Sequence, residues 1–484
     1  MAAETDLAPR QALVPGAVVD GWLLEEKLHT GGMAHLWGVR RAPDAEPLPD
    51  EFAGMPLIMK VPRLKGGEDP TAIVGFEVEQ MVLPALTGPH VPRFVARGDF
   101  TRTPYIVMER IAGPTLRPRL DEAPLAVDEV IEIGSRVATA LHELHRQHLV
   151  HLDIKPSNIM LRPDGTAVLV DFGLAHHDRL PDLLTEEFNL PMGTGPYISP
   201  EQVQYVRTDP RSDLFALGVM LYHFTTGERP FGNPETVREL RRRLYVDPLP
   251  PRAIRSDCPP WLQEVILKCL EVKPDRRWPS ASQLALALQD PAQVPLTARA
   301  QRMQRSSALR RFKRWFFAAG AEPARGAPMG VTAQVAKSPL IVAAVDIEGA
   351  DPALLEKLQQ TVRRFVVAEP GARLACLGVM KIARIGMDDK LDRSGQSLHV
   401  KQLVGLKHWA RPISKSLDLD EGRLTFHVLE APDAAAAIID FADRNQVDHI
   451  VMGARGVSTL RRLLGSVSEQ VVARSDCTVT VVRP

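Results

Sequence analysis

Periodic runs of apolar residues occupy two long stretches of the chain, residues 18–290 and 338–484. The stretch between them has no such runs, and a short polar segment precedes the first. A change of this kind in hydrophobic periodicity marks boundaries between folded units and their connections. The pattern predicts a flexible leader (1–17), an amino-terminal domain (18–290), a linker (291–337) and a carboxyl-terminal domain (338–484).

The amino-terminal stretch changes from strand-like to helix-like spacing. It begins as a β-rich lobe at residues 18–22, and apolar runs at 57–60 and 105–109 predict buried strands. Farther on, apolar side chains recur every three or four positions, at Val130, Ile133, Val137, Leu141 and Leu144. This spacing places them on one face of an amphipathic helix. We therefore expect a strand-rich lobe followed by a helical lobe.

The carboxyl-terminal stretch alternates between the two kinds of pattern. The apolar run 340–345 ends at Asp346, and predicted strands at 374–380, 424–429, 450–452 and 478–482 are interspersed with helical patterns near 354–365 and 434–442. Strands that alternate with helices form parallel sheets, in which ligands bind at the carboxyl ends of the strands. We expect an α/β domain with an open parallel sheet.

Composition narrows the range of functions. The 484 residues include 59 basic and 59 acidic side chains, so no overall field attracts the protein to nucleic acid. The four cysteines show no CxxC spacing and are expected to be buried thiols in a reducing cytoplasm. The chain begins without the apolar segment of a signal peptide, and no run reaches the ~18 apolar residues of a membrane span. These features favour a cytoplasmic protein without a transmembrane segment.

The candidate catalytic residues lie in two short segments: residues 151–158, which read His-Leu-Asp-Ile-Lys-Pro-Ser-Asn, and the Asp-Phe-Gly sequence 171–173. Phosphoryl transfer needs a carboxylate to orient the attacking hydroxyl, and oxygen ligands to hold a metal ion against the phosphates. Asp153 is the candidate base, and Asn158 and Asp171 are the candidate Mg²⁺ ligands. Lys155 places an ammonium group beside them.

These motifs resemble the catalytic core of eukaryotic-type serine/threonine protein kinases of bacteria. The resemblance implies an α+β bilobal fold, ATP and Mg²⁺ as cofactors and protein substrates. It also implies that Lys60 binds the α- and β-phosphates and pairs with a helix carboxylate, which is Glu79 or the competing Glu77. Further residues that the resemblance assigns are the glycine loop (Gly31, Gly32), the adenine contacts (Met108, Glu109, Ile111) and Thr194 in the substrate loop.

Three positions depart from the family pattern. His29 and Ala34 replace two glycines of the G-x-G-x-x-G loop, which weakens the case for tight ATP binding. Leu152 replaces the arginine that normally binds a phosphate on the activation segment. The alternative to an active kinase is therefore a pseudokinase that acts as a binding protein in signalling.

The linker carries basic and aromatic residues but no acid between Arg299 and Phe317. Such a segment suits peripheral contact with an anionic membrane or docking on a partner. The alternative interpretation is a charged linker helix that packs Trp315 and Phe316 against one of the protein's own domains.

Glycines follow a predicted strand in the carboxyl-terminal domain. Gly453 and Gly456 stand at the end of the strand 450–452, and Gly465 and Ser466 come before a helix, so that backbone N–H groups can bind phosphate. This arrangement, together with Asp346, resembles the ATP-binding universal stress proteins, although the spacing is one residue shorter. The resemblance implies a second nucleotide site, or a role in assembly such as a homodimer formed through this domain.

Overall fold

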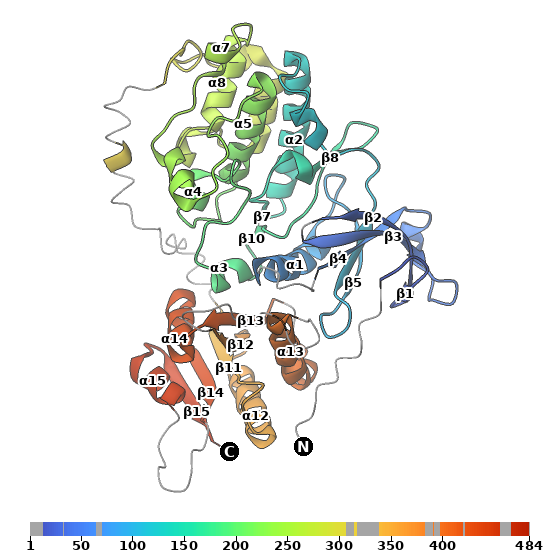
Figure 1. Cartoon of the computed structure of the whole chain (residues 1–484), viewed down its shortest axis with the longest axis vertical. Helices are drawn as coiled ribbons and strands as arrows, with labels where there is room; N and C mark the ends of the chain where they lie inside the picture. Colours follow the sequence, from blue (N-terminus) through green and yellow to red (C-terminus); the bar gives the residue numbers. More distant parts are fainter. Residues whose placement is uncertain are drawn as a thin grey trace.

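The computed structural model describes residues 13–31, 33–63, 70–305, 314–316, 338–382, 391, 397–419, 422–454 and 466–483. Figure 1 shows the two lobes of the amino-terminal domain and a carboxyl-terminal α/β unit packed beneath them. Within the described ranges, every helix falls short of the length and apolar content that a bilayer-spanning helix needs.

An antiparallel sheet forms the first lobe, with the strand order β1-β2-β3-β4-β6-β5. Alternating residues along the strands point to one face, where Trp22, Trp37 and Met59 form a core. Helix α1 (Pro70–Val82) accompanies this sheet and buries Phe76 and Val78. The strands are β1 (Val18–Val19), β2 (Trp22–Thr30), β3 (Ala34–Arg41), β4 (Leu57–Pro62), β5 (Phe94–Gly98) and β6 (Tyr105–Glu109).

Helices build the second lobe around α2 (Val127–His145) and α5 (Arg211–Thr226). The apolar face predicted for α2 is the face that it buries. Helix α5 is buried along almost its whole length and ends at Gly227, whose φ of 76° suits a residue without a side chain. The other elements are β7 (Leu149–Val150), β8 (Ile159–Leu161), β9 (Ala167–Leu169), β10 (His176–His177), α3 (Leu183–Glu187), α4 (Pro200–Val203), α6 (Val237–Leu240), α7 (Pro251–Ile254), α8 (Pro260–Cys269) and α9 (Ala281–Gln289).

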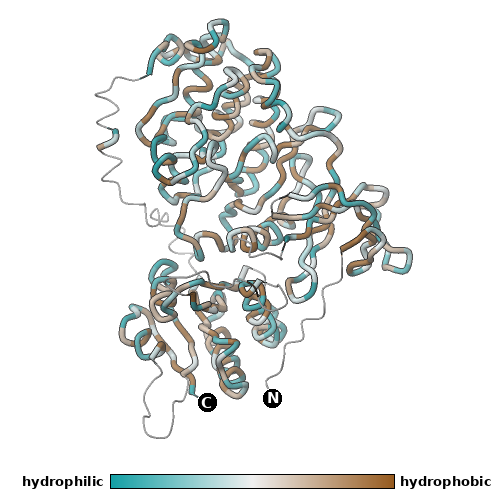
Figure 2. The backbone as a smooth tube through the Cα atoms, viewed as in Figure 1, coloured by the Kyte–Doolittle hydropathy of each residue, from teal (hydrophilic) through white to brown (hydrophobic). Residues whose placement is uncertain are grey.

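The carboxyl-terminal domain is an open parallel sheet with the strand order β13-β12-β11-β14-β15, in agreement with the predicted fold class. In Figure 2 its strands are largely brown, because residues of both sheet faces are buried under helices. Its elements are β11 (Leu340–Ala344), α12 (Pro352–Ala368), β12 (Arg373–Lys381), α13 (Leu398–Leu417), β13 (Leu424–Ala431), α14 (Ala434–Asn445), β14 (His449–Gly453), α15 (Ser466–Arg474) and β15 (Thr478–Val482). Helix α13 was not among the predicted helices.

The segment after α9 packs back on the second lobe. The backbone N–H and hydroxyl of Thr297 both donate to Glu264 of α8, and Arg299 forms an ion pair with the same carboxylate at 3.0 Å. Farther along, Arg314 pairs with Asp247 at 2.5 Å. The described part of the predicted linker therefore contacts the amino-terminal domain, while Trp315 and Phe316 are largely exposed.

Candidate active site

A hydrogen-bonded triad lies at the loop between β7 and β8. Lys155 Nζ is 2.7 Å from Asp153 Oδ2 and 2.8 Å from Thr194 Oγ1. The Thr194 hydroxyl donates to Asp153 Oδ1 at 2.7 Å, and its backbone N–H donates to the same oxygen. Asp153, Lys155 and the substrate-loop residue Thr194 are therefore in contact, although 39 positions separate Lys155 from Thr194.

A buried carboxylate accepts hydrogen bonds from the backbone of this loop. Asp213, in the first turn of α5, is fully buried and accepts hydrogen bonds from the backbone N–H groups of His151 and Leu152. Leu152 adopts a left-handed φ of 64°, which is costly for a branched side chain. The two hydrogen bonds to Asp213 offset this cost and fix the direction in which Asp153 points.

A second cluster joins the two lobes. Lys60 on β4 lies 2.5 Å from Glu79 Oε2 on α1 and 2.8 Å from Asp171 Oδ1. Burial disfavours the ammonium, but the negative charges of Asp171 and Glu79, and the hydrogen bonds that Lys60 donates to them, raise the pKa of Lys60. In turn, the charge of Lys60 lowers the pKa of Asp171 to about 2. Of the two carboxylates considered for this pairing, Glu79 faces Lys60, whereas Glu77 points elsewhere.

Two oxygen-bearing side chains near these clusters suit a divalent cation. The Asn158 side-chain nitrogen donates to the backbone oxygen of Asp153 and to Asp153 Oδ2, so the amide is held beside the loop carboxylate. Asp171 supplies a carboxylate that Lys60 keeps ionised. Hard oxygen donors of this kind, completed by water and phosphate, are the ligands that Mg²⁺ prefers. Among the described residues no group of three or more His, Cys, Asp or Glu side chains forms a separate metal site.

The candidate adenine contacts lie on and after β6. Met108 and Ile111 are buried, and the backbone N–H of Glu109 donates to Arg93 O. The Glu109 side chain forms a two-pronged ion pair with Arg162, which the sequence did not indicate. In the glycine loop, the Gly31 N–H donates to Ala34 O and closes the turn between β2 and β3. Gly32 lies outside the described residues.

The carboxyl-terminal domain holds a cavity of about 740 Å³ at the point where its strand order reverses. Asp346 follows β11, Gly453 ends the neighbouring β14, and both line this cavity together with Ser466 at the start of α15. Asp346 Oδ1 also accepts a hydrogen bond from the Gly349 N–H. The structure therefore gathers three of the predicted residues, while Gly456 and Gly465 lie outside the described residues.

Comparison with known families agrees with this geometry. Residues 68–287 match the protein kinase domain, and residues 338–483 match the universal stress protein family. The chain joins a kinase domain to a universal stress protein domain. Both predicted fold classes are thereby confirmed.

The kinase domain is similar to bacterial serine/threonine kinases. Serine/threonine-protein kinase PknB of Mycolicibacterium smegmatis is 32% identical over 275 residues, which are 56% of this chain and 43% of that protein. PknB of Mycobacterium tuberculosis strain H37Rv is 31% identical over 56% of this chain and 42% of its own length. The chain thus spans less than half the length of these relatives. A crystal structure of the Mycobacterium tuberculosis PknI kinase domain is 25% identical, covers 57% of this chain and 99% of that chain, and has a TM-score of 0.44.

The kinase domain also has an anchor that the sequence analysis missed. Asp182 caps the short helix α3, and it accepts hydrogen bonds from the guanidinium of Arg207 and from His176. Burial of Asp182 opposes its charge, but Arg207 and His176 outweigh this effect and lower the pKa of its carboxyl. The segment that follows Asp171 is therefore tied down by side chains of the kinase domain itself. The sequence showed only that Leu152 stands where the family pattern has an arginine, and it did not indicate Arg207 or His176 as partners of Asp182.

Proposed function

We propose that the protein is an ATP-dependent serine/threonine protein kinase. The observation that carries the proposal is the simultaneous presence of the Lys60 cluster with Glu79 and Asp171 and the Asp153 cluster with Lys155 and Thr194. A kinase needs both clusters in place at once, because one positions the phosphates and the other positions the hydroxyl.

The roles follow from the positions of the side chains. Asp153 accepts the proton of the substrate hydroxyl, and Lys155 stabilises the charge on the transferred group. Thr194 holds both of them in register with the peptide substrate. Lys60 binds the α- and β-phosphates, supported by Glu79. The remaining nucleotide contacts are assigned to Gly31, Gly32, Met108, Glu109 and Ile111.

Mg²⁺ is the proposed metal ion, held by Asn158 and Asp171. When bound, it neutralises charge on the phosphates. Because Lys60 keeps Asp171 ionised and Asp153 holds Asn158 by two hydrogen bonds, both ligands are arranged in advance of binding. We place the kinase domain at residues 18–290, the linker at 291–337 and the stress protein domain at 338–484.

A non-catalytic binding protein is the second candidate, favoured by the glycine loop, where His29 and Ala34 stand in place of glycine. The decisive experiment measures phosphate incorporation from labelled ATP with Mg²⁺ into generic protein substrates. An Asp171→Ala variant is the matched control. Incorporation that depends on Asp171 supports the kinase, whereas equal incorporation in both proteins, or none in either, supports the binding protein.

We further propose that the stress protein domain binds a nucleotide without hydrolysing it. The cavity at Asp346 and Gly453 is of a size suited to a nucleotide. In the described part of its lining the one lysine, Lys381, forms no ion pair with Asp346 or Glu348 of the kind that Lys60 and Lys155 form in the kinase site. Calorimetric titration with ATP measures the number of sites. Two sites per chain are expected for the unaltered protein, and one for a Gly453→Trp variant, in which a large side chain fills the cavity. A single site in both proteins would leave assembly as the role of this domain.

A further inference from the structure

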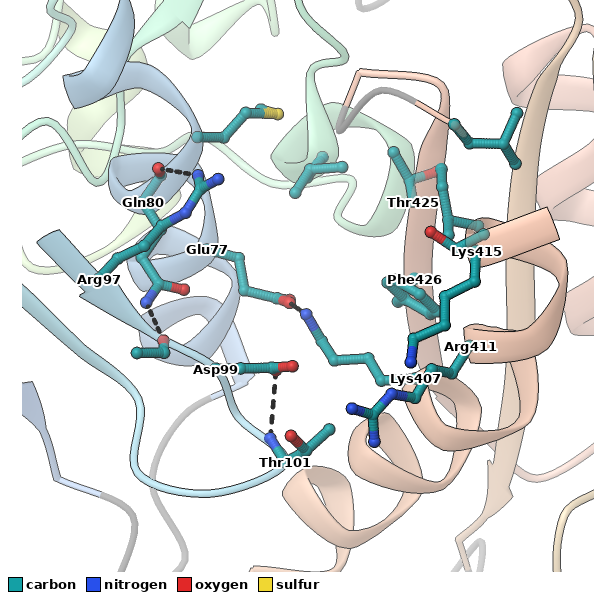
Figure 3. A pocket seen from close by; sticks show the side chains of 16 residues that line it. Glu77, Gln80, Arg97, Asp99, Thr101, Lys407, Arg411, Lys415, Thr425 and Phe426 are labelled. Carbon is teal, nitrogen blue, oxygen red and sulfur yellow. Dashed lines mark hydrogen bonds and ion pairs between the residues drawn. The ribbon is translucent and has the colours of Figure 1, made fainter. Parts of the chain in front are cut away.

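The stress protein domain contacts the kinase domain through charged side chains that are largely buried. Lys407 of α13 lies 2.8 Å from Glu77 Oε1 of α1, and the exposed fractions of the two side chains are 19% and 10%. Figure 3 shows this ion pair bridging the two domains along the wall of a cavity of about 490 Å³. The Lys407 ammonium also lies over the rings of Phe426 and Phe100, at 4.9 and 5.3 Å from their centroids. If one member of an ion pair enclosed in this way is removed, the other charge stays buried without its partner, which costs more than the loss of an exposed pair.

A second contact binds α3, the short helix that follows the Asp-Phe-Gly motif. The fully buried His427 of β13 lies between two carboxylates of this helix, with Nε2 3.2 Å from Glu186 and Nδ1 3.3 Å from Glu187. Arg373 adds an ion pair to Glu186 at 2.9 Å. The Asn445 side chain donates to the backbone oxygen of Glu186. The stress protein domain therefore fixes α3 by side chains from three of its elements.

Of the two contacted helices, α1 lies directly against the catalytic residues. Glu79, the partner of Lys60, is two residues from Glu77 on the same helix, so a displacement of α1 moves both carboxylates. In addition, α1 touches the Asp-Phe-Gly turn directly, because a Cβ added to Gly75 would lie 3.0 Å from the backbone oxygen of Gly173. The position of α1 thus sets the geometry of both Lys60 and Asp171.

The structure indicates whether contact with the stress protein domain favours or disrupts the active site. With the two domains in contact, the Lys60 cluster and the Asp153 cluster are both intact. A domain that inhibited the kinase by docking would be expected to break one of them. Contact between the two domains is therefore compatible with an active site in which both clusters are formed.

We propose that Lys407 is a positioning residue for phosphoryl transfer: by holding Glu77, it keeps α1 where Glu79 pairs with Lys60, and the kinase depends on the docked stress protein domain. This inference rests on the proposed kinase function. A coupling of typical size between two sites corresponds to an effect of about 5- to 150-fold.

The test uses the full-length protein and the variant Lys407→Met, which keeps the length and most of the apolar stem of the side chain but removes its charge. Lys415→Met, on the same helix and lining the same cavity, is the matched control. We expect Lys407→Met to lower kcat/KM for phosphoryl transfer by about 5-fold or more and to raise KM for ATP. Lys415→Met should leave both quantities unchanged. Equal kinetics in Lys407→Met and the unaltered protein, or faster phosphoryl transfer in Lys407→Met, would overturn the proposal.

A charge exchange distinguishes positioning from general stability. Lys407→Glu combined with Glu77→Lys restores the opposite pairing, so the double variant should recover activity that either single variant loses. Hydrogen exchange of the α1 amides provides a readout that does not require catalysis. We expect faster exchange in α1 for Lys407→Met, with the amides of α5 unchanged. If the unaltered protein transfers no phosphate, a change in α1 exchange still supports the positioning role, and an unchanged α1 rejects it.

Discussion

Glu77 and Glu79 stand two positions apart on helix α1 and accept ion pairs from lysines of different domains. Two residues correspond to about 200° around a helix, so the side chains leave it on opposite sides. Glu79 reaches inward to Lys60, and Glu77 reaches outward to Lys407 of the stress protein domain. One turn of helix therefore connects the nucleotide site of the kinase domain with the interface between the domains.

The two aspartates of the catalytic centre should separate binding from chemistry. Asp171→Asn removes the charge that faces Lys60 and the proposed metal ion, so we expect it to weaken Mg²⁺-supported ATP binding. Asp153→Asn should leave this affinity nearly unchanged and lower turnover by about a hundredfold or more. Calorimetry and steady-state kinetics on the same preparations provide the comparison. Equal losses of ATP affinity in the two variants would contradict the assigned roles.

Replacement of two threonines in the segment after Asp171 should affect activity to very different extents. The Thr194 hydroxyl bridges Asp153 and Lys155, and its removal misplaces both, so Thr194→Ala should reduce activity by about a hundredfold. Thr185 only joins the cap of α3 through Asp182, and Arg207 also holds that carboxylate. We therefore expect Thr185→Ala to keep most of the activity. A large loss in Thr185→Ala would contradict this expectation.

The buried ion pair between Arg277 and Glu201 should govern the stability of the helical lobe. The two guanidinium nitrogens lie 2.6 Å from the two carboxylate oxygens, and both side chains are buried. Arg277→Met leaves Glu201 charged and without its partner, at an expected cost of about 3–5 kcal/mol in the free energy of unfolding. The control Arg117→Met breaks the exposed pair with Asp121, which should cost about 0–1 kcal/mol. Urea unfolding measures both, and similar values for the two variants would refute the ranking.

The interface between the domains should weaken in alkaline solution. Burial of the His427 ring opposes its charge, but the carboxylates of Glu186 and Glu187, which accept hydrogen bonds from the ring and attract its positive charge, raise its pKa to about 9, from 6.5. A raised pKa stabilises the folded protein fully below pH 6.5, and this stabilisation is lost as the pH rises through 9. Across that window the loss amounts to about 1.4 kcal/mol per pH unit.

His176 is the other histidine whose pKa is raised, and its contribution has to be separated from that of His427. Burial opposes the charge of His176, but Asp178 and Asp182 raise its pKa to about 9 within the kinase domain. Urea unfolding at a series of pH values gives the free energy of unfolding between pH 6 and 9. In a His427→Gln variant this free energy should still fall with rising pH, because His176 remains, but less steeply than in the unaltered protein. An identical slope in both proteins would show that His427 does not contribute.

The spacing of apolar residues predicted individual helices and strands of both domains. The five apolar residues from Val130 to Leu144 gave the buried face of α2, and the run that ends at Asp346 gave β11 and its place beside a cavity. Helix α13 was missed although its buried residues Val400, Leu403, Val404, Ala410 and Ile413 keep helical spacing. Pro412 within the helix and the many polar residues between them obscured this signal.

Contacts between distant segments could not be predicted in this way. Residues 77 and 407 are 330 positions apart, and no periodicity in either helix indicates that they meet. The choice between Glu77 and Glu79 also stayed open, because both belong to a helix that is largely buried on several sides. The tertiary fold decides which carboxylate faces Lys60, and the second carboxylate acquires a role only through another domain.

The close approach of Gly75 to Gly173 leaves little room for any side chain at position 75. Neither glycine bears a polar group, and neither is among the residues assigned to ATP or to the peptide substrate. Still, a methyl group at position 75 would lie 3.0 Å from the backbone oxygen of Gly173, so either α1 or the Asp-Phe-Gly turn has to shift slightly to accommodate it. We therefore expect the smallest possible change in side-chain volume at position 75 to alter how α1 packs on the Asp-Phe-Gly turn, although every proposed catalytic residue and every ion pair of the interface is retained in the sequence.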